Sequence, residues 1–323
     1  MGNENKKNYK NNLNIKNIST LKIHKNSVND IIFYTENNKN YLISVSKDKT
    51  IKISDLIEMK IKMEINIHSN QINYINILKN KNLISCGDDK KIIIFKLDLK
   101  NQKFFIIHQI KNAHNLGIIK VIEIFDKLLS ISFDYQIFLW NFDEIKNEYF
   151  KCFFVKEKSF IYDILLLKEN EFVDCTEKFE INFYKIENSN ENNNKIIKFH
   201  TINNIEISFW HNILFKFNEK FLFVGGINCI FIIDLNEYKY INLIENDFWI
   251  FSFCKLNEKF FLTGDLFNIK LWKFEHEKIW FQSNKKIHNK SITKIIKINE
   301  KKLISSSIDN LIKIFDIKEI LFN

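Results

Sequence analysis

The sequence predicts an all-β fold made of seven copies of one unit, and three observations support this. A phrase recurs along the chain: residues 42–56 read LISVSKDKTIKISDL, residues 83–97 read LISCGDDKKIIIFKL and residues 303–317 read LISSSIDNLIKIFDI. Seven segments of this type follow one another at intervals of 39 to 49 residues. The chain also begins with a surplus strand and stops within an incomplete unit, so its two ends complement each other.

Each unit contains short segments in which apolar residues alternate as they do in β-strands, and these segments are bounded by Asn, Asp, Lys and Glu. In the first unit the expected strands cover residues 28–33, 41–46, 50–54 and 61–67. Four short strands in about 40–45 residues are typical of one blade of a β-propeller. The position two residues before the end of the phrase aligns the seven units at Ser54, Phe95, Trp140, Tyr184, Ile233, Trp272 and Phe315.

The two ends of the chain predict how the ring closes. The last unit stops at Asn323, soon after its third strand, whereas residues 15–23 form a strand that precedes the first unit. Closure by that strand removes the sheet edges that an open array would expose. We therefore expect a seven-bladed β-propeller closed by an N-terminal strand that completes the last blade. Residues 1–12 are expected to form a disordered Asn/Lys-rich tail, and residues 13–323 a single propeller.

Composition limits the partners and the cellular location. The chain is 46% hydrophobic with a net charge of +9, and every cation is Lys, so Arg is absent for bidentate contacts to guanine or phosphate. The abundance of Lys, Asn, Ile and Phe is what an AT-rich coding sequence produces. We attribute the charge mainly to that bias, and an adapted basic surface is the alternative.

The cysteines and the apolar stretches indicate an intracellular protein. The five cysteines are an odd number without a CxxC pair, which argues against a disulfide framework and a zinc site. We find no secretory signal, and the longest apolar stretch, 221–233, is too short for a bilayer span. We expect no membrane insertion and a location in the cytoplasm or the nucleus.

Four units share a set of polar residues: a His before the first strand, a Ser in the second strand and an Asp in the following turn. The set comprises His24, Ser44, Asp48, His68, Ser85, Asp89, His114, Ser130, Asp134, His288, Ser305 and Asp309, with Trp140 added in the third unit. On these residues the chain resembles the WD-repeat propellers. The resemblance implies that the set forms a buried hydrogen-bond network within each blade.

A Ser, a His and an Asp also suggest the triad of a hydrolase. An active site needs such a constellation once, however, whereas a scaffold needs it in every blade. We therefore expect no catalytic residues, no cofactor and no metal site.

The fourth, fifth and sixth units lack this set and share a different pattern. Each has a Glu at the His position and a Phe three residues later, in EKSFI (157–161), EISFW (206–210) and ENDFW (245–249). Either the aromatic residues anchor a partner near one rim, or they fill the volume of the missing network while Glu faces water. The candidate partner-binding residues are Glu157, Phe160, Glu206, Phe209, Trp210, Glu245, Phe248 and Trp249.

The favoured function is a non-enzymatic scaffold that mediates protein–protein interactions within a multi-subunit complex. The alternative is a propeller subunit of a ribonucleoprotein, in ribosome biogenesis or RNA processing, that contacts RNA through its Lys-rich surface. An enzyme with a site in the central channel would require unique inward-facing polar residues on one blade. The sequence alone does not reveal such a set.

Overall fold

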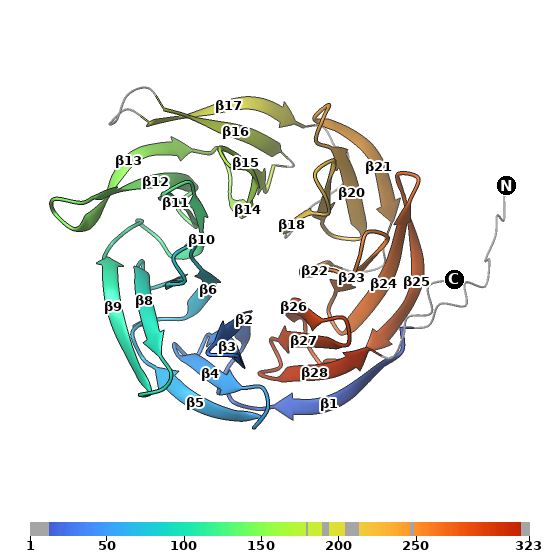
Figure 1. The fold of residues 1–323 in the computed structure, drawn as a ribbon. Helices are drawn as coiled ribbons and strands as arrows, with labels where there is room; N and C mark the ends of the chain where they lie inside the picture. The colour runs from blue at the N-terminus through green and yellow to red at the C-terminus, as the bar shows by residue number, and fades with distance from the viewer. Residues whose placement is uncertain (1–12, 179, 189–193, 204–212, 246–248, 318–323) are drawn as a thin grey trace.

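The chain forms a ring of seven four-stranded antiparallel sheets, which confirms the predicted seven-bladed β-propeller (Figure 1). The computed structural model describes residues 13–178, 180–188, 194–203, 213–245 and 249–317. The predicted tail, residues 1–12, lies outside this part. In each blade one strand lines the central channel and the next strands follow outward in sequence order, except that the outermost strand of the seventh blade is β1 (Ile15–Leu21).

The strand bounds follow the predicted units. The first four blades are β2 (Val28–Glu36), β3 (Lys39–Ser46), β4 (Ile51–Asp55) and β5 (Lys60–Ile65); β6 (Ile72–Ile77), β7 (Leu83–Gly87), β8 (Ile92–Asp98) and β9 (Lys103–Ile110); β10 (Ile118–Ile124), β11 (Lys127–Ser132), β12 (Gln136–Asp143) and β13 (Glu148–Lys156); β14 (Ile161–Lys168), β15 (Glu171–Thr176), β16 (Ile181–Asn188) and β17 (Asn194–Ile202).

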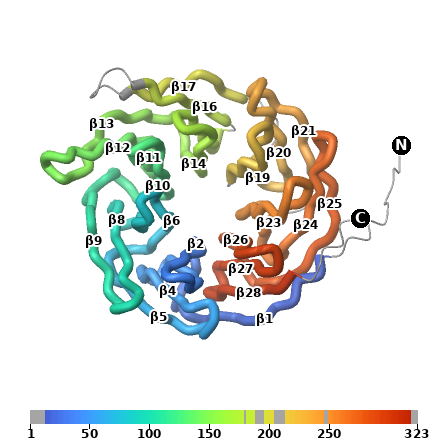
Figure 2. Tube along the Cα trace, viewed as in Figure 1, coloured from blue at the N-terminus to red at the C-terminus, as the bar shows by residue number. Residues whose placement is uncertain are grey.

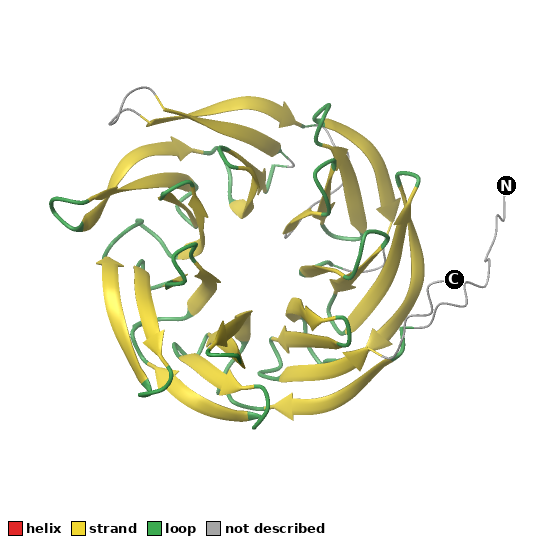
Figure 3. Cartoon of the chain, in the orientation of Figure 1, coloured by secondary structure: helices red, strands yellow, loops and turns green. Residues whose placement is uncertain are grey.

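The fifth to seventh blades continue in the same way. Their strands are β18 (Ile213–Lys216), β19 (Phe221–Gly225), β20 (Cys229–Asp234) and β21 (Lys239–Glu245); β22 (Ser252–Lys255), β23 (Phe260–Gly264), β24 (Asn268–Glu275) and β25 (Lys278–Lys286); β26 (Ile292–Asn299), β27 (Lys302–Ser307), β28 (Ile312–Ile317) and β1 (Ile15–Leu21). No helix in the described part is long and apolar enough to cross a lipid bilayer, and Figure 3 shows the strands joined by loops.

Closure of the ring depends on β1, the outer strand of the seventh blade. It pairs antiparallel with β28, from Ile15 opposite Ile317 to Leu21 opposite Ile312. The two ends of the described chain therefore lie side by side (Figure 2). The backbone N–H of Leu13 also donates to Ser283 Oγ of the sixth blade, at 2.8 Å.

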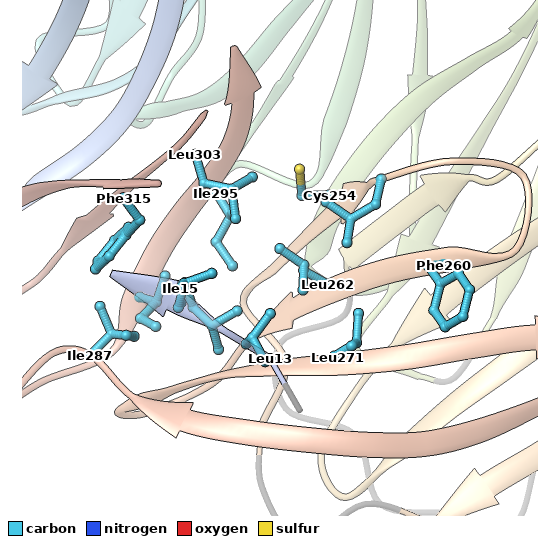
Figure 4. Packing of buried hydrophobic residues seen from close by; sticks show 13 residues of the cluster. Leu13, Ile15, Cys254, Phe260, Leu262, Leu271, Ile287, Ile295, Leu303 and Phe315 are labelled. Carbon is cyan, nitrogen blue, oxygen red and sulfur yellow. The ribbon is translucent and has the colours of Figure 1, made fainter. Parts of the chain in front are cut away.

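The hydrophobic core consists of seven clusters, each shared by two neighbouring blades. Successive residues of a middle strand belong to different clusters. Leu42 of β3 packs towards the seventh blade, and Ile43 towards the second. Because both faces of each middle strand are buried, most of their residues are apolar or small, and the few charged ones, such as Lys52 and Asp174, have polar partners. In the cluster of blades six and seven, Leu13 and Ile15 of the N-terminal segment lie beside Ile287 and Phe315 (Figure 4).

The turn after the second strand has the same geometry in four blades. The residue after the network Asp takes a left-handed backbone conformation, with φ between 62° and 73°, at Lys49, Lys90, Tyr135 and Asn310. In each turn the Asp carboxylate accepts the N–H two residues on, as Thr50 donates to Asp48 Oδ1 at 3.1 Å. Such side-chain hydrogen bonds stabilise tight turns, so the Asp fixes the turn as well as the network.

We predict that the closing strand contributes strongly to stability through its buried face. Replacing Ile15, which is 1% exposed, with Ala should lower the free energy of unfolding by about 2–5 kcal/mol, because a cavity opens between blades six and seven. The control Ile18→Ala, at a residue of β1 that is 41% exposed, should change it by about 0.5 kcal/mol or less. Urea denaturation monitored by circular dichroism measures both, and equal effects would contradict this role of β1.

Candidate functional site

The His, Ser and Asp side chains of blades one, two, three and seven lie within hydrogen-bonding distance of one another. Each His Nδ1 lies 2.9–3.2 Å from its Asp carboxylate, and each Nε2 lies 2.7–2.8 Å from its Ser Oγ. The Asp also accepts the backbone N–H of the residue after the His, as Lys25 donates to Asp48 at 2.9 Å. The turn, the loop before the first strand and the second strand are thus joined in each blade.

The protonation states explain how these groups satisfy one another. Burial acts to raise the pKa of the four carboxylates, but hydrogen bonds from the His ring and the backbone outweigh it and lower the pKa. The ionised Asp accepts from Nδ1–H, and Nε2 then accepts from the Ser hydroxyl. Burial also lowers the pKa of His288, which keeps its ring neutral. The four Ser side chains are fully buried, so no substrate could reach them as nucleophiles.

Two tryptophans extend this arrangement to the third strand. Trp140 Nε1 donates to Ser130 Oγ at 2.8 Å in blade three, and Trp272 Nε1 donates to Thr263 Oγ1 at 2.8 Å in blade six. The sixth unit was expected to lack every member of the set, but it does have the hydroxyl, at Thr263. The turn of blade six is one residue shorter than in blade three, so Thr263 occupies that position.

Blade four replaces the set with a different buried network. Tyr184 Oη lies 2.6 Å from Glu157 Oε1 and 2.8 Å from Asp174 Oδ2. Lys198 Nζ pairs with the Glu157 carboxylate at 2.9 Å, and Asn182 Nδ2 donates to Asp174 Oδ1 at 2.8 Å. Glu157 therefore stands in for His, Asp174 for Ser and Tyr184 for Trp.

This geometry corrects the expectation for Glu157. It was expected near the rim, either beside a partner or facing water, but its side chain is only 5% exposed and it belongs to the interior network. One phenol proton cannot serve two ionised carboxylates at once. Burial, and then the charge of Glu157, raise the pKa of Asp174 to about 7. Below that pH, a neutral Asp174 donates to Tyr184, which donates to Glu157.

The mouth of the central channel holds charged side chains that the sequence analysis missed. A cavity of about 250 Å³ is lined by the inner strands. Lys120 of blade three pairs with Asp163 of blade four at 2.8 Å, and Lys294 of blade seven pairs with Asp30 of blade one at 3.2 Å. These residues occupy the same place on their strands but come from four blades, so no single repeat shows the set.

Each of these aspartates also accepts a hydrogen bond from a backbone N–H of the next blade. Asp30 Oδ2 accepts the N–H of Ile75 at 3.3 Å, and Asp163 Oδ2 accepts that of Leu214 at 2.9 Å. Two series of contacts thus each connect three blades. One series connects blades seven, one and two, and the other connects blades three, four and five. They stiffen the channel wall and neutralise the charges that line it.

Aromatic side chains gather beside this mouth on blades three and four. Phe160 lies 5.3 Å from the ring of Phe133, 6.3 Å from Tyr135 and 4.8 Å from Tyr162, which lines the channel cavity. Phe133 and Tyr135 are 37% and 42% exposed. On blade six, Trp249 is 36% exposed and lies 6.0 Å from Phe251, which lines the same cavity. We call Phe133, Tyr135, Phe160 and Trp249 the channel-mouth surface.

The remaining candidate partner-binding residues cannot be placed. Glu206, Phe209, Trp210 and Phe248 lie outside the described residues, as does the side chain of Glu245. Ile161, the first residue of β14, and Ile250, two residues before β22, are both buried and hold equivalent positions in blades four and six. Trp249, rather than Phe248, is therefore the counterpart of Phe160.

We predict a pH-dependent stability that originates in blade four. The folded protein keeps the Asp174 proton up to about pH 7, whereas the unfolded chain loses it near the ordinary pKa of 3.8, so stability falls as pH rises between these values. Asp174→Asn mimics the neutral acid. Its stability advantage over the wild type should grow by about 2–3 kcal/mol between pH 5 and pH 8, at about 1.4 kcal/mol per pKa unit. Thermal melts at both pH values test this. A stability difference that does not change with pH, as expected for the exposed control Asp126→Asn, would contradict it.

Comparison with known proteins agrees with this architecture. A family model described as WD domain, G-beta repeat, matches residues 15–55, which span β1 to β4 and contain His24, Ser44 and Asp48. A search of curated proteins finds no match. The matched repeat and the seven four-stranded blades together identify the chain as a WD-repeat β-propeller.

Proposed function

We propose that this protein is an intracellular scaffold, in the cytoplasm or the nucleus, that holds protein partners within a multi-subunit complex. WD-repeat propellers in general bind other proteins and are typically not enzymes. The observation that carries the proposal is the channel-mouth surface, where exposed aromatic rings lie beside paired charges. Aromatic side chains of this kind supply much of the binding energy of protein interfaces.

The surroundings of this surface favour a preorganised contact. Phe160 is held between Phe133 and Tyr162, and the channel wall below is fixed by the Lys120–Asp163 pair. A rigid surface loses little conformational entropy when a partner binds. The partner best matched is a protein segment that places apolar side chains on the aromatic rings and polar groups over the channel mouth.

The second candidate is a ribonucleoprotein subunit, and one observation favours it. The chain carries a net charge of +9, which attracts the RNA backbone, and exposed aromatic rings can stack on unpaired bases. The charges at the channel mouth compensate one another, since each Asp lies beside a Lys. The site itself therefore lacks the net positive charge that RNA would require, and we favour a protein partner.

We predict that partners depend on the channel-mouth surface. Phe133→Ala combined with Tyr135→Asn should remove a defined set of proteins that co-purify with the tagged protein from its own cells, after nuclease treatment. Asn suits position 135 because it tolerates the left-handed backbone there. Mass spectrometry of the purified complexes provides the measurement.

A matched control variant tests whether the loss of partners is specific to the channel-mouth surface or follows the removal of any exposed aromatic rings. Phe105→Ala combined with Phe154→Ala changes rings that are 52% and 53% exposed on the outer strands β9 and β13. It should leave the partners unchanged, and circular dichroism verifies that both variants are folded. Retention of all partners by the folded channel-mouth variant would overturn the proposal. Salt-sensitive binding of a single-stranded RNA, lost in that variant, would favour the ribonucleoprotein instead.

A further inference from the structure

We propose that the seam between blades six and seven binds a compact phosphoryl anion with two or more negative charges. A pocket of about 410 Å³ lies where the start of β1 meets β28 and the end of β25. Four of the nine residues that line it are lysines: Lys16, Lys285, Lys286 and Lys313. The site exists because the N-terminal strand closes the ring, and it rests on no part of the proposed scaffold function.

The lysines of this pocket have no carboxylate among its nine lining residues, and Asp316, directly opposite Lys16 in the strand register, forms no ion pair with Lys16 within the described part of the chain. Across the described ranges, no ion pair joins any of the four lysines to an Asp or Glu, although many other lysines have such partners. Like charges that share a pocket repel one another, so an anion bound there would relieve that repulsion.

An equivalent lysine in the first blade has a carboxylate partner that Lys313 lacks. Lys52 and Lys313 hold the same position on the third strands of blades one and seven, two residues before Ser54 and Phe315. Lys52 Nζ donates to the carbonyl of Ile23 at 2.8 Å and pairs with Glu64, directly opposite on β5, at 2.9 Å.

The seventh blade has the hydrogen bond to a backbone carbonyl but lacks the ion pair. Lys313 Nζ donates to the carbonyl of Ile287 at 2.6 Å, but the residue directly opposite on β1 is Thr20. In blade six the corresponding Lys270 lies 3.6 Å from Asp265. A carboxylate thus neutralises this lysine in two blades, whereas in the seventh blade the lysine faces the pocket.

The lysines are arranged to donate to a shared anion. Lys285 Nζ donates to the carbonyl of Ile15, so this ammonium group and that of Lys313 are each anchored by one backbone acceptor. An ammonium group has three N–H donors, which leaves two on each for a ligand. Lys16 and Lys286 are exposed and extend the cationic wall. Phosphoryl oxygens are strong acceptors for such donors, and several charges on one ligand match four cations better than a single carboxylate does.

Calorimetric titration of the purified full-length protein with inorganic tripolyphosphate tests the site. We expect saturable binding with one anion per chain. Lys16→Gln combined with Lys286→Gln should weaken binding by about tenfold or more. Neither side chain donates a hydrogen bond within the described part of the protein, and the substitution removes one cation–π contact, that of Lys286 with Phe267 at 5.5 Å. The control Lys100→Gln with Lys103→Gln removes the same charge from exposed positions on blade two and should leave the affinity unchanged. Absence of saturable binding, or equal weakening in both variants, would overturn the proposal.

A second variant introduces a carboxylate side chain opposite Lys313. Thr20→Glu should reproduce the Lys52–Glu64 pair at Lys313, raise the melting temperature without added anion and abolish the further rise that tripolyphosphate gives the wild type. Thr35→Glu, on blade one, should have neither effect. If Thr20→Glu still responded to tripolyphosphate as the wild type does, the pocket would not be the site.

Sedimentation with vesicles that contain a phosphoinositide distinguishes a lipid headgroup from a soluble phosphate as the source of the ligand. Lysine-dependent binding to both vesicles and tripolyphosphate would identify a headgroup, and binding to tripolyphosphate alone would identify a soluble compound. RNA binding that depends on Lys16 and Lys286, without tripolyphosphate binding, would contradict a compact anion.

Discussion

The pairing of β1 with β28 is the interaction on which the remaining structure depends. Without it the seventh blade would have three strands, and the outer edge of β28 would lie open. Each core cluster is shared by two blades, so no blade buries its apolar faces alone. Closure therefore stabilises every other interface, and it also creates the channel and the lysine pocket. Radial repetition of this kind leaves only short edges, at the inner strands that line the channel and at the outer strands of the rim.

The blades fill the equivalent part of their interiors with different side chains. Blades one, two, three and seven join their strands through a buried His, Ser and Asp. Blade four uses two carboxylates bridged by Tyr184, with Lys198 as the counter-charge. In blades five and six the same region is filled mainly by aromatic rings, among them Phe217, Phe223 and Phe261. All three solutions pair or remove polar groups whose burial without a partner would be costly.

Repetition made the fold predictable from the sequence, and loss of repetition limited what could be predicted at the sites. The seven units and the surplus strand fixed the number of blades and the closing strand. Thr263 was missed because the turn of blade six is one residue shorter than that of blade three, so the hydroxyl lies one residue nearer to the Trp than in the other repeat. Glu157 was misplaced because its partners, Tyr184 and Lys198, belong to later strands that only the sheet brings near. Likewise, the charged pairs at the channel mouth join different blades, and Lys313 faces Thr20 only once the ring has closed.

Hydrogen–deuterium exchange of the native protein, followed by mass spectrometry of its peptides, tests the central claim most directly. Amides paired in a stable sheet exchange slowly, whereas those of an unpaired terminal strand exchange rapidly. If β1 closes the ring, peptides that cover Ile15–Leu21 should be protected to the same degree as those of β5, the outer strand of blade one, and β28 should be protected like β4. Rapid exchange of β1, with β28 behaving as an open edge, would contradict the closed ring and everything inferred from it.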